Sequence, residues 1–358
     1  MPRPKVDADQ SGALPAFRPR IFRPTPANLA RLAAVLRSGG IVGVPSETVY
    51  GLAADALSAE ACKRIFAAKG RPSTDPLIVH LASSRELDSV AVASPTAYAL
   101  ASACWPGPLT LVLPKRAEVP DLVTAGKATV AVRVPAHPLF RRLIRLVGRP
   151  LAAPSANPFG YISPTTALHV REGLTGSGLR SILQGGECTV GVESTIIDLT
   201  HPTRPLLLRP GGLPVETIEG VLGQTVLRPP PACLDIGEAA PAPGMLTQHY
   251  SPHTPLTLHT RIDAGILEQL PENEAVLLLR RPEKSAAFGV VSAKVAANRV
   301  RWLSERGELE AIAHRLFGVL RAMDSEAWAR LHSEIPNGSE GLAPAIRDRL
   351  TRAAARRN

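Results

Sequence analysis

Aromatic residues and long apolar runs are scarce or missing in this chain of 358 residues. Aromatic residues make up 4% of it, and no stretch alternates them with basic residues, as stacking surfaces for single-stranded nucleic acid usually do. No stretch reaches the roughly 18 apolar residues that a membrane span needs. The N-terminal charges are not followed by the apolar core of a signal peptide, so we expect a cytoplasmic protein without membrane contact.

Cysteine patterns that indicate metal or disulfide chemistry are also missing. The chain has four cysteines, and they form no Cys-x-x-Cys pair and have no neighbouring histidine pattern. This argues against a zinc site and against a disulfide framework. We therefore expect unpaired thiols and no protein-held metal ion. The four residues are Cys62, Cys104, Cys188 and Cys233.

Positive charge and apolar residues are abundant. The formal net charge is +10 at pH 7, and 45% of the residues are hydrophobic. The charge excess favours an anionic partner such as nucleic acid or nucleotide, but an arginine-rich surface exposed to solvent would produce it too. The apolar content is enough for a sizeable core, and the length favours two domains over one.

Patterns of helix and strand alternate after a short N-terminal stretch. Residues 1–24 lack periodicity and mix proline, glycine and charge, which is typical of a disordered arm. Over residues 25–225, helical runs such as 58–70 alternate with short β-rich apolar runs such as 76–82. Such runs are typical of strands buried under helices, so we expect an α/β domain that is too mixed for a plain Rossmann fold.

A second domain is expected after a proline-dense stretch. Residues 226–255 contain too much proline for a helix or a central strand and predict an extended linker. Beyond it, residues 256–358 again alternate strand patterns with helix patterns. They predict a smaller α/β domain.

Lys69 and Arg71 stand on a loop whose backbone is constrained by Gly70 and Pro72. Two cations on such a loop suit a clamp for phosphate or carboxylate, because arginine grips an oxyanion with two nitrogens. Two basic residues at a helix C-terminus also complement the helix dipole, and this stretch alone does not separate the two interpretations. The loop is not a Walker loop, since GxxxxGK[ST] is absent.

Polar side chains follow other expected strands. Ser155 and Asn157 come directly after an apolar strand, where open α/β sheets bind ligands, although an isolated Ser-Ala-Asn more often bonds its own backbone. Thr48 lies in a polar loop that is as readily structural. Arg133 stands inside an apolar strand, so it needs a carboxylate partner from the protein or from a ligand, and the strand alone favours the protein.

Further candidates are weak one by one. Ser194 lies at a strand start and Arg209 at a strand exit. His80 ends an apolar strand, where a half-buried structural histidine is common. His249 and Tyr250 are harder to dismiss, because a proline-rich linker gains nothing from an adjacent histidine and tyrosine unless they dock on something.

Taken in order, nine motifs resemble the threonylcarbamoyl-AMP synthase family in its long form, which has a YrdC-like domain, a linker and a smaller C-terminal domain. The resemblance runs from about residue 25 to the end of the chain, except for a stretch near residues 282–300, and the joint order of the motifs is specific. It implies a YrdC-like twisted mixed sheet with flanking helices and a concave ligand cavity, followed by a smaller Rossmann-like α/β domain. The motifs are PSETVYGL, KGRPSTDPLIVH, WPGPLTLVL, TVAVRVP, SANPFGYISPT, GVESTIIDL, LLRPGG, PGMLTQHYSP and GLAPAIRDRLTRAA.

This resemblance implies a nucleotidyltransferase that makes threonylcarbamoyl-AMP and pyrophosphate from L-threonine, bicarbonate and ATP. A threonylcarbamoyl-transferase complex then uses the product to modify an adenosine of tRNA, and a direct contact with tRNA is a further candidate. Mg²⁺ is expected to accompany ATP, and no cluster of Asp and Glu marks a protein cage for it.

By the same resemblance, the site residues fall into three sets. A Lys-x-Arg and Ser-x-Asn signature holds the nucleotide phosphates and the reacting acyl-phosphate, and it falls on Lys69, Arg71, Ser155 and Asn157. The threonine pocket falls on Thr48, His80, Arg133, Ser155 and Ser194, and further nucleotide contacts fall on Thr129, Thr165, Arg209, His249 and Tyr250.

The sequence departs from the family pattern at three places. Ser46 replaces a threonine, and Asp75 stands where many relatives have asparagine, although a carboxylate there would repel phosphate. Residues 246–248 lack the lysine or arginine of some relatives. A lid over residues 243–252 that shields an unstable carbamate from water would therefore depend on His249 and Tyr250.

Two other functions match part of the pattern. A double-stranded RNA-binding or ribosome-maturation protein on the same fold would explain the positive charge, but it would not need a threonine pocket or a lid. A carbamoyl-phosphate-dependent hydrogenase maturation enzyme would carry zinc-finger cysteine pairs and an acylphosphatase segment, and this sequence has neither.

Overall fold

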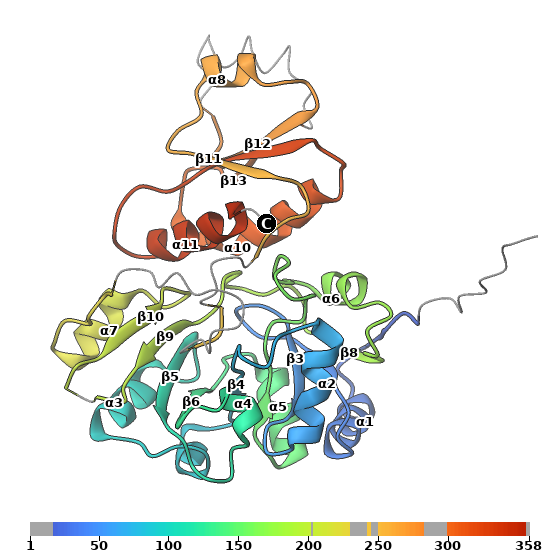
Figure 1. Cartoon of the computed structure of the whole chain (residues 1–358), viewed down its shortest axis with the longest axis vertical. Helices are drawn as coiled ribbons and strands as arrows, with labels where there is room; N and C mark the ends of the chain where they lie inside the picture. Colours follow the sequence, from blue (N-terminus) through green and yellow to red (C-terminus); the bar gives the residue numbers. More distant parts are fainter. Residues whose placement is uncertain (1–16, 202, 230–241, 245–249, 283–298, 356–358) are drawn as a thin grey trace, which may run out of the picture.

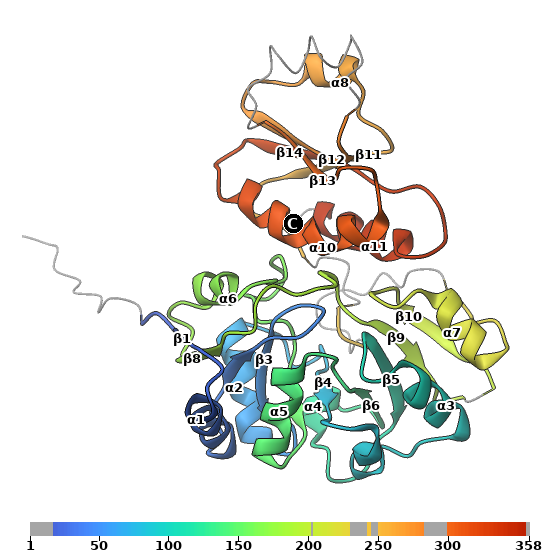
Figure 2. The same ribbon diagram turned by 180° about the vertical axis from the view of Figure 1, so that it is seen from behind.

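The computed structural model describes residues 17–201, 203–229, 242–244, 250–282 and 299–355. Two α/β domains follow each other along the chain, and Figures 1 and 2 show the smaller, C-terminal one in orange and red above the larger one. The larger domain contains a mixed sheet and the smaller one a parallel sheet. The expected fold class is confirmed.

Within the described residues, ten strands form one mixed sheet in the larger domain, in the order β1-β8-β2-β3-β7-β4-β6-β5-β9-β10. The pairs β4 with β6 and β5 with β9 are parallel, whereas β6 and β5 are antiparallel. The strands are β1 Arg20–Phe22, β2 Val42–Val44, β3 Gly51–Asp55, β4 Ile78–His80, β5 Leu109–Pro114, β6 Thr129–Arg133, β7 Leu151–Ala152, β8 Ser181–Leu183, β9 Thr195–Asp198 and β10 Leu206–Arg209.

Helices of this domain begin and end where local signals place them. The side chain of Thr25 accepts a hydrogen bond from the backbone of α1, and Ser58 does the same for α2. The helix α2 ends at Lys69 because Gly70 adopts the left-handed conformation with φ 63°. The helices are α1 Pro26–Arg37, α2 Ala59–Lys69, a 3₁₀ helix Ser84–Ser89, α3 Pro95–Cys104, α4 Asp121–Thr124, α5 Pro138–Val147, α6 Ala167–Gly173 and α7 Val215–Leu222.

The two faces of the large sheet are covered differently. In β3, Leu52 and Ala54 face the cluster that includes α2 and α3, and Ala53 faces α1 and α5 on the other side. On this second face, over β4, β6, β5 and β9, the linker residue Ala242 packs in a small cluster that includes Ile78. A segment of the linker therefore packs on the same face of the sheet as α5.

The smaller domain is built on four parallel strands among the described residues, in the order β11-β14-β12-β13. One face packs on α10 and α11, which Figures 1 and 2 show between this sheet and the larger domain. The other face packs on α8. The elements are β11 Leu256–His259, α8 Ala264–Gln269, β12 Glu274–Arg280, β13 Val300–Ser304, α10 Leu309–Asp324, β14 Arg330–Glu334 and α11 Ala343–Ala354.

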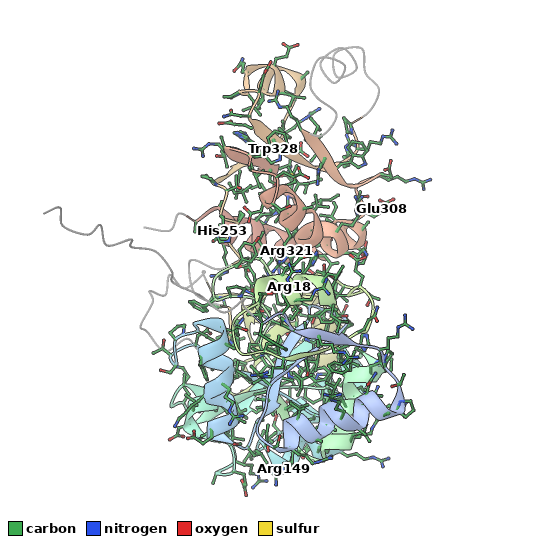
Figure 3. The ribbon with its side chains drawn as sticks, turned by 90° about the vertical axis from the view of Figure 1, so that its right-hand side faces the viewer. Arg18, Arg149, His253, Glu308, Arg321 and Trp328 are labelled. Carbon is green, nitrogen blue, oxygen red and sulfur yellow. The ribbon has the colours of Figure 1, made fainter. Side chains whose placement is uncertain are left out.

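The two domains share one apolar cluster, to which α10 contributes Leu316 and Phe317. Arg321, also on α10, lies at this junction (Figure 3) and donates hydrogen bonds to the backbone carbonyls of Ile162 and Ser163. The smaller domain is thus packed onto the larger one by buried contacts. The cluster residues outside the smaller domain are Val49, Ile162, Val192 and Tyr250.

The structure differs from the expected arm over residues 1–24. Residues 20–22 form β1, which pairs in parallel with β8, because Phe22 is buried between the sheet and α1. Residues 1–16 lie outside the described residues. Of the expected linker over residues 226–255, the structure describes residues 226–229, 242–244 and 250–255, so its extended form stays largely a prediction.

Three further findings concern the classes considered above. In the described part of the chain, no helix is long and apolar enough to cross a membrane. Cys62, Cys104 and Cys188 are free thiols, and Cys233 lies outside the described residues. No group of three or more His, Cys, Asp or Glu side chains in these ranges could hold a metal ion.

Candidate active site

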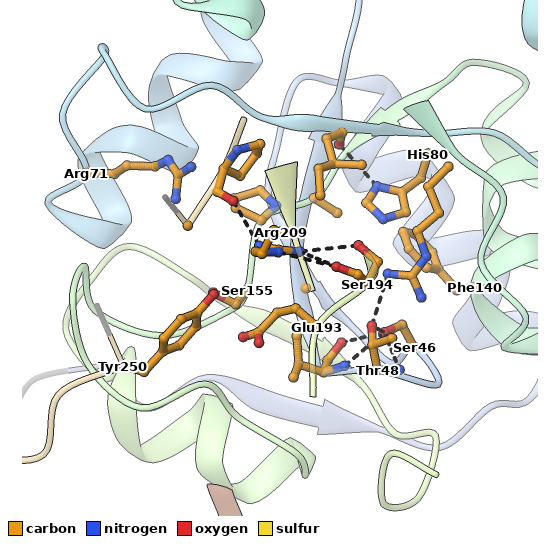
Figure 4. A pocket seen from close by; sticks show the side chains of 18 residues that line it. Ser46, Thr48, Arg71, His80, Phe140, Ser155, Glu193, Ser194, Arg209 and Tyr250 are labelled. Carbon is orange, nitrogen blue, oxygen red and sulfur yellow. Dashed lines mark hydrogen bonds between the residues drawn. The ribbon is translucent and has the colours of Figure 1, made fainter. Parts of the chain in front are cut away.

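A cavity of about 50 Å³ lies on the second face of the large sheet, beside the linker (Figure 4). In Figure 4, Arg71 and Tyr250 lie at one end, His80, Ser46 and Thr48 lie at the other, and Arg209 lies between them. Eight of the expected site residues line the cavity, and they are Thr48, Arg71, His80, Arg133, Ser155, Ser194, Arg209 and Tyr250.

Strand register brings several of these side chains together. His80 and Arg133 are paired in the parallel register of β4 and β6, and both strands end there. The neighbouring β5 runs the other way, and β9 lies parallel to it, so β9 begins where β6 ends. Ser194, just before β9, therefore reaches the hydroxyl of Thr110 at 2.8 Å.

Arg133 has a protein partner in the cavity wall. Its Nη2 lies 2.5 Å from the Glu47 carboxylate, its Nη1 donates to the Thr48 hydroxyl at 3.0 Å, and its Nε donates to the carbonyl of Gly107. Burial alone would raise the pKa of the Glu47 carboxyl, but the Arg133 charge and nearby hydrogen bonds hold it below its usual value. The carboxylate that the sequence required is thus Glu47.

Thr48 and His80 are held by short-range contacts. The Ser46 hydroxyl lies 2.9 Å from the Thr48 hydroxyl and donates to the carbonyl of Val49, which fixes the turn after β2. His80 donates from Nδ1 to the carbonyl of Ile78, and its ring packs 5.2 Å from that of Phe140. Burial, together with the Arg133 charge, lowers the pKa of His80 to about 3, so the imidazole is neutral.

Lys69 lies behind the cavity wall. Its ammonium donates hydrogen bonds to the backbone carbonyls of Ser155 at 2.5 Å and Asn157 at 2.6 Å. It therefore joins the end of α2 to the loop after β7. Burial, and next the Arg71 charge, lower the pKa of Lys69 well below its usual value. The Asn157 side chain, in turn, donates to the carbonyls of Pro158 and Tyr161.

Arg71 lines the cavity and pairs with Asp75. The two side chains meet at 2.9 Å and are almost completely buried. Arg71 also donates to the backbone carbonyls of Asp75 and Pro76. Burial raises the pKa of the Asp75 carboxyl, and the Arg71 charge opposes this effect only in part. An ionised Asp75 would neutralise Arg71 until a ligand competes for it.

Arg209 joins the sheet to the linker. Its Nη2 donates to the carbonyl of Ser194 at 2.9 Å, and its Nη1 donates to the carbonyl of Pro243 at 2.9 Å. Tyr250 adopts a left-handed backbone with φ 65°, and its ring stacks on Phe317 of the smaller domain. Two described segments of the linker, residues 242–244 and 250–255, therefore border the cavity. His249 lies outside the described residues.

Two expected nucleotide contacts are not brought into this cavity. Thr129 is the first residue of β6, at the opposite end of the strand from Arg133. Thr165 is buried, and its hydroxyl lies 3.4 Å from Nδ1 of His169. Their role in binding nucleotide stays a prediction.

Glu193 is a lining residue that sequence reasoning missed. Its carboxylate accepts a hydrogen bond from the Ser163 hydroxyl at 2.6 Å and one from Arg349 of α11 at 2.7 Å. Both partners are distant in the sequence, so no local pattern could indicate them. The only signal was a glutamate directly before a buried strand.

The cavity wall combines guanidinium groups with hydroxyls and a neutral imidazole. Such groups bind carboxylate or phosphate and stabilise charge that develops during transfer of an acyl or phosphoryl group. Three carboxylates at the cavity wall are each paired with an arginine. These pairs are Glu47 with Arg133, Asp75 with Arg71, and Glu193 with Arg349.

Family models match both domains. The model of the Sua5, YciO and YrdC proteins, described as telomere recombination, matches residues 34–211. A second model, described as the C-terminal domain of threonylcarbamoyl-AMP synthase, matches residues 213–355. The boundary between the two matches lies between β10 and α7.

Full-length relatives match over nearly the whole chain. The threonylcarbamoyl-AMP synthase of Pyrococcus abyssi is 43% identical over 327 residues, which cover 91% of this chain and 93% of the relative. That of Bacillus subtilis is 40% identical over 336 residues, which cover 92% and 93%. A crystal structure of P. abyssi Sua5 complexed with L-threonine matches with a TM-score of 0.82 and 39% identity, over 94% of this chain and 97% of that one. The chain therefore belongs to the threonylcarbamoyl-AMP synthase family, in its two-domain form.

Proposed function

We infer that this protein is an L-threonylcarbamoyladenylate synthase, a nucleotidyltransferase that uses L-threonine, bicarbonate and ATP. The amino group of threonine condenses with bicarbonate to a carbamate with loss of water, and a carbamate oxygen then attacks the α-phosphorus of ATP and expels pyrophosphate. The observation that carries this function is that guanidinium and hydroxyl groups from separate strands line one cavity. Transfer of this kind requires mainly alignment and stabilisation of charge.

We place L-threonine at the end of the cavity formed by Thr48, His80, Arg133, Ser155 and Ser194. The hydroxyls and the neutral imidazole can bond the polar atoms of an amino acid without adding charge. Arg133 pairs with Glu47 through Nη2 and donates to the Thr48 hydroxyl through Nη1, so a threonine carboxylate bound at this guanidinium would compete with existing contacts. A ligand must therefore gain further contacts with the cavity wall to displace these partners, and a negative charge alone would not be enough.

The nucleotide belongs at the other end, beside Arg71, Arg209 and Tyr250, with Lys69 and Asn157 shaping the wall. A cavity of about 50 Å³ is far below the roughly 300 Å³ of small ligand pockets. ATP can therefore enter only when the described linker residues, Pro243, Gly244 and Tyr250, move away. Their return would shield the carbamate from water.

Magnesium would arrive with the phosphates of ATP. Bound Mg²⁺ would neutralise phosphate charge during the transfer. No group of three or more His, Cys, Asp or Glu in the described residues could hold it, and Glu47, Asp75 and Glu193 are each paired with an arginine. The protein's own contribution is to orient the phosphates with Arg71 and Arg209.

The product would pass to a threonylcarbamoyl-transferase complex that modifies tRNA. A direct contact with tRNA belongs to the same proposal. The alternative, a double-stranded RNA-binding protein on the same fold, gains no support from the site. The cavity arginines Arg71, Arg133 and Arg209 are buried and cannot reach the phosphates of a duplex.

The test is the release of pyrophosphate from ATP as a function of L-threonine and bicarbonate. We expect release to require both, and we expect Arg71→Ala to lower it by about a hundredfold, the scale of losing one charge-stabilising donor. Lys63→Ala is the matched control, since Lys63 lies on α2 and forms an exposed ion pair with Glu60. Release that continues without threonine would refute the assignment.

A further inference from the structure

The active-site cavity has a buried arginine behind it that comes from the smaller domain. Arg349 lies on α11 and is fully buried, although it is the longest kind of cationic side chain. Its Nε donates to the Glu193 carboxylate at 2.7 Å, and its Nη1 lies 2.5 Å from Asp348. Arg349 thus pairs with one carboxylate of its own helix and one of the cavity wall.

The contact to Glu193 bears on the site directly. Glu193 lines the cavity, is 7% exposed, and precedes Ser194, whose hydroxyl and carbonyl are both bonded by Arg209. One carboxylate oxygen of Glu193 accepts from Ser163 of the larger domain and the other from Arg349. The orientation of Glu193 is therefore set jointly by the two domains.

A second contact of Arg349 leads to the linker. Its guanidinium carbon lies 5.1 Å from the centre of the Tyr250 ring, and the centre of the Phe317 ring of α10 lies 5.6 Å from the same ring. Tyr250 also lines the cavity. Its hydroxyl lies so near Gly244 that a Cβ on that glycine would be 2.7 Å away. Arg349 therefore contacts two lining residues that belong to different segments.

The contacts of Arg349 with Glu193 and Tyr250 are electrostatic as well as steric. An arginine removed from this position leaves the Glu193 carboxylate buried without its cation, and a buried unpaired charge is strongly unfavourable. Glu193 would then take up a proton or turn towards the cavity and Arg209. Either change alters the wall next to Ser194. The Tyr250 ring would at the same time lose the cation against its face.

We propose that Arg349 is a positioning residue of the active site, through which the smaller domain holds Glu193 and Tyr250 in the geometry that binds L-threonine. The proposal rests on the proposed function for the identity of the ligand. Arg349 itself does not line the cavity, so it acts only through these two side chains. The smaller domain is thereby a part of the site rather than an appendage.

The test compares Arg349→Met with two matched arginine variants. Arg321→Met removes another buried arginine of the domain junction, one that donates to the backbone carbonyls of Ile162 and Ser163 and lies over the Tyr161 ring. Arg347→Met removes an arginine of the same helix that bonds the carbonyls of Pro336 and Gly338 within the smaller domain. Each variant is measured for thermal stability, for L-threonine affinity by calorimetry, and for KM and kcat of pyrophosphate release.

We expect Arg349→Met to weaken L-threonine binding by about tenfold or more, the scale of losing a charged hydrogen bond. Arg321→Met and Arg347→Met should lower the melting temperature yet leave threonine affinity within about twofold of the wild type, because no lining side chain loses a partner. Equal losses of threonine affinity in Arg349→Met and Arg321→Met would overturn the proposal. Such a result would mean that threonine affinity depends on the packing of the two domains and not on the contacts of Arg349 with Glu193 and Tyr250.

A double-mutant cycle adds a measurement that a merely structural role would not affect. We expect Glu193→Gln to restore part of the threonine affinity that Arg349→Met loses, because the unpaired charge is then gone. If the double variant lost threonine affinity by the product of the two single-variant losses, coupling through Glu193 would be contradicted. Arg349→Lys keeps the charge without the planar fork and provides the same comparison if the Met variant does not fold.

Calorimetry keeps this proposal separate from the proposed function. Wild-type protein that binds L-threonine but releases no pyrophosphate would disprove the synthase activity and still allow the Arg349 comparison. Wild-type protein that binds no L-threonine would overturn both proposals.

Discussion

At the scale of single residues, the site consists of buried arginines whose charges are already balanced. Arg71 pairs with Asp75, and Arg133 pairs with Glu47, each with little exposure to solvent. A buried pair contributes little to stability, but breaking it by removing one partner costs several kcal/mol. The pairs therefore hold cations in place for a ligand without leaving an uncompensated charge in its absence.

His80 provides a prediction about pH. Its pKa is lowered to about 3 by burial and then by Arg133, from 6.5 in the unfolded chain. Below pH 6.5 the unfolded chain binds a proton that the folded chain does not, so stability falls as the pH falls towards about 3 and is unaffected by His80 above pH 6.5. We expect His80→Gln to remove up to about 1.4 kcal/mol of this loss per pH unit.

Urea denaturation of the wild type and of His80→Gln between pH 4 and pH 7 measures this slope. The His169 pKa is also lowered by burial, to about 4, so His169→Gln should flatten the curve in the same direction over a narrower range. Parallel curves for the wild type and His80→Gln would contradict a neutral, buried His80.

At the scale of elements, the start of β9 is held by a close backbone contact. A Cβ on Gly211 would lie 2.3 to 2.4 Å from backbone atoms of Glu193, Ser194 and Thr195. Real Cβ atoms do not approach backbone so closely. Gly211, in the loop after β10, therefore allows residues 193–195, at the start of β9, to lie against the loop that follows Arg209.

We expect Gly211→Ala to displace the start of β9 and to lower L-threonine affinity by more than about tenfold, because Ser194 and Glu193 move with the strand. Gly220→Ala is the matched control. A Cβ on Gly220, inside α7, meets no atom within 4 Å, so that change should stabilise the fold by about 0.5–1 kcal/mol. Titration of both variants with L-threonine measures the affinities, and thermal melts measure the stabilities. Unchanged threonine affinity in Gly211→Ala would contradict the prediction.

At the scale of the whole molecule, the site depends on how the two domains meet. Gly191 has φ +82°, and a Cβ there would lie 2.4 Å from the carbonyl oxygen of Ala313 and from the Cα of His314 on α10. The loop that leads to Glu193 therefore touches the helix backbone of the smaller domain. This contact leaves no space for a side chain.

We expect Gly191→Ala to push α10 away from the larger domain and to lower both threonine affinity and protection of α10 amides from hydrogen exchange. Gly186→Ala is the control for backbone strain, since Gly186 has φ +84° but a Cβ there meets nothing within 4 Å. Both variants should lose about 1 kcal/mol to strain. Faster exchange in α10 should appear in Gly191→Ala alone, and its appearance in both would count against a domain contact.

The amino-acid sequence by itself determined the fold class, the family and most of the segments that border the cavity. Buried strands and capped helices are local patterns, and eight of the expected site residues line one cavity. It did not indicate β1, β8 or β14, which are short strands recognisable only by their neighbours in the sheet.

Only the tertiary structure decided which carboxylate balances each arginine and which domain completes the site. Arg133 meets Glu47 across 86 residues of sequence, and Arg349 meets Glu193 across 156. Lys69 was expected among the phosphate contacts, yet here it bonds the carbonyls of Ser155 and Asn157. The physical reason is that strand register and helix packing, which bring distant segments together, choose the partners of buried charges, and no local pattern in the chain encodes them.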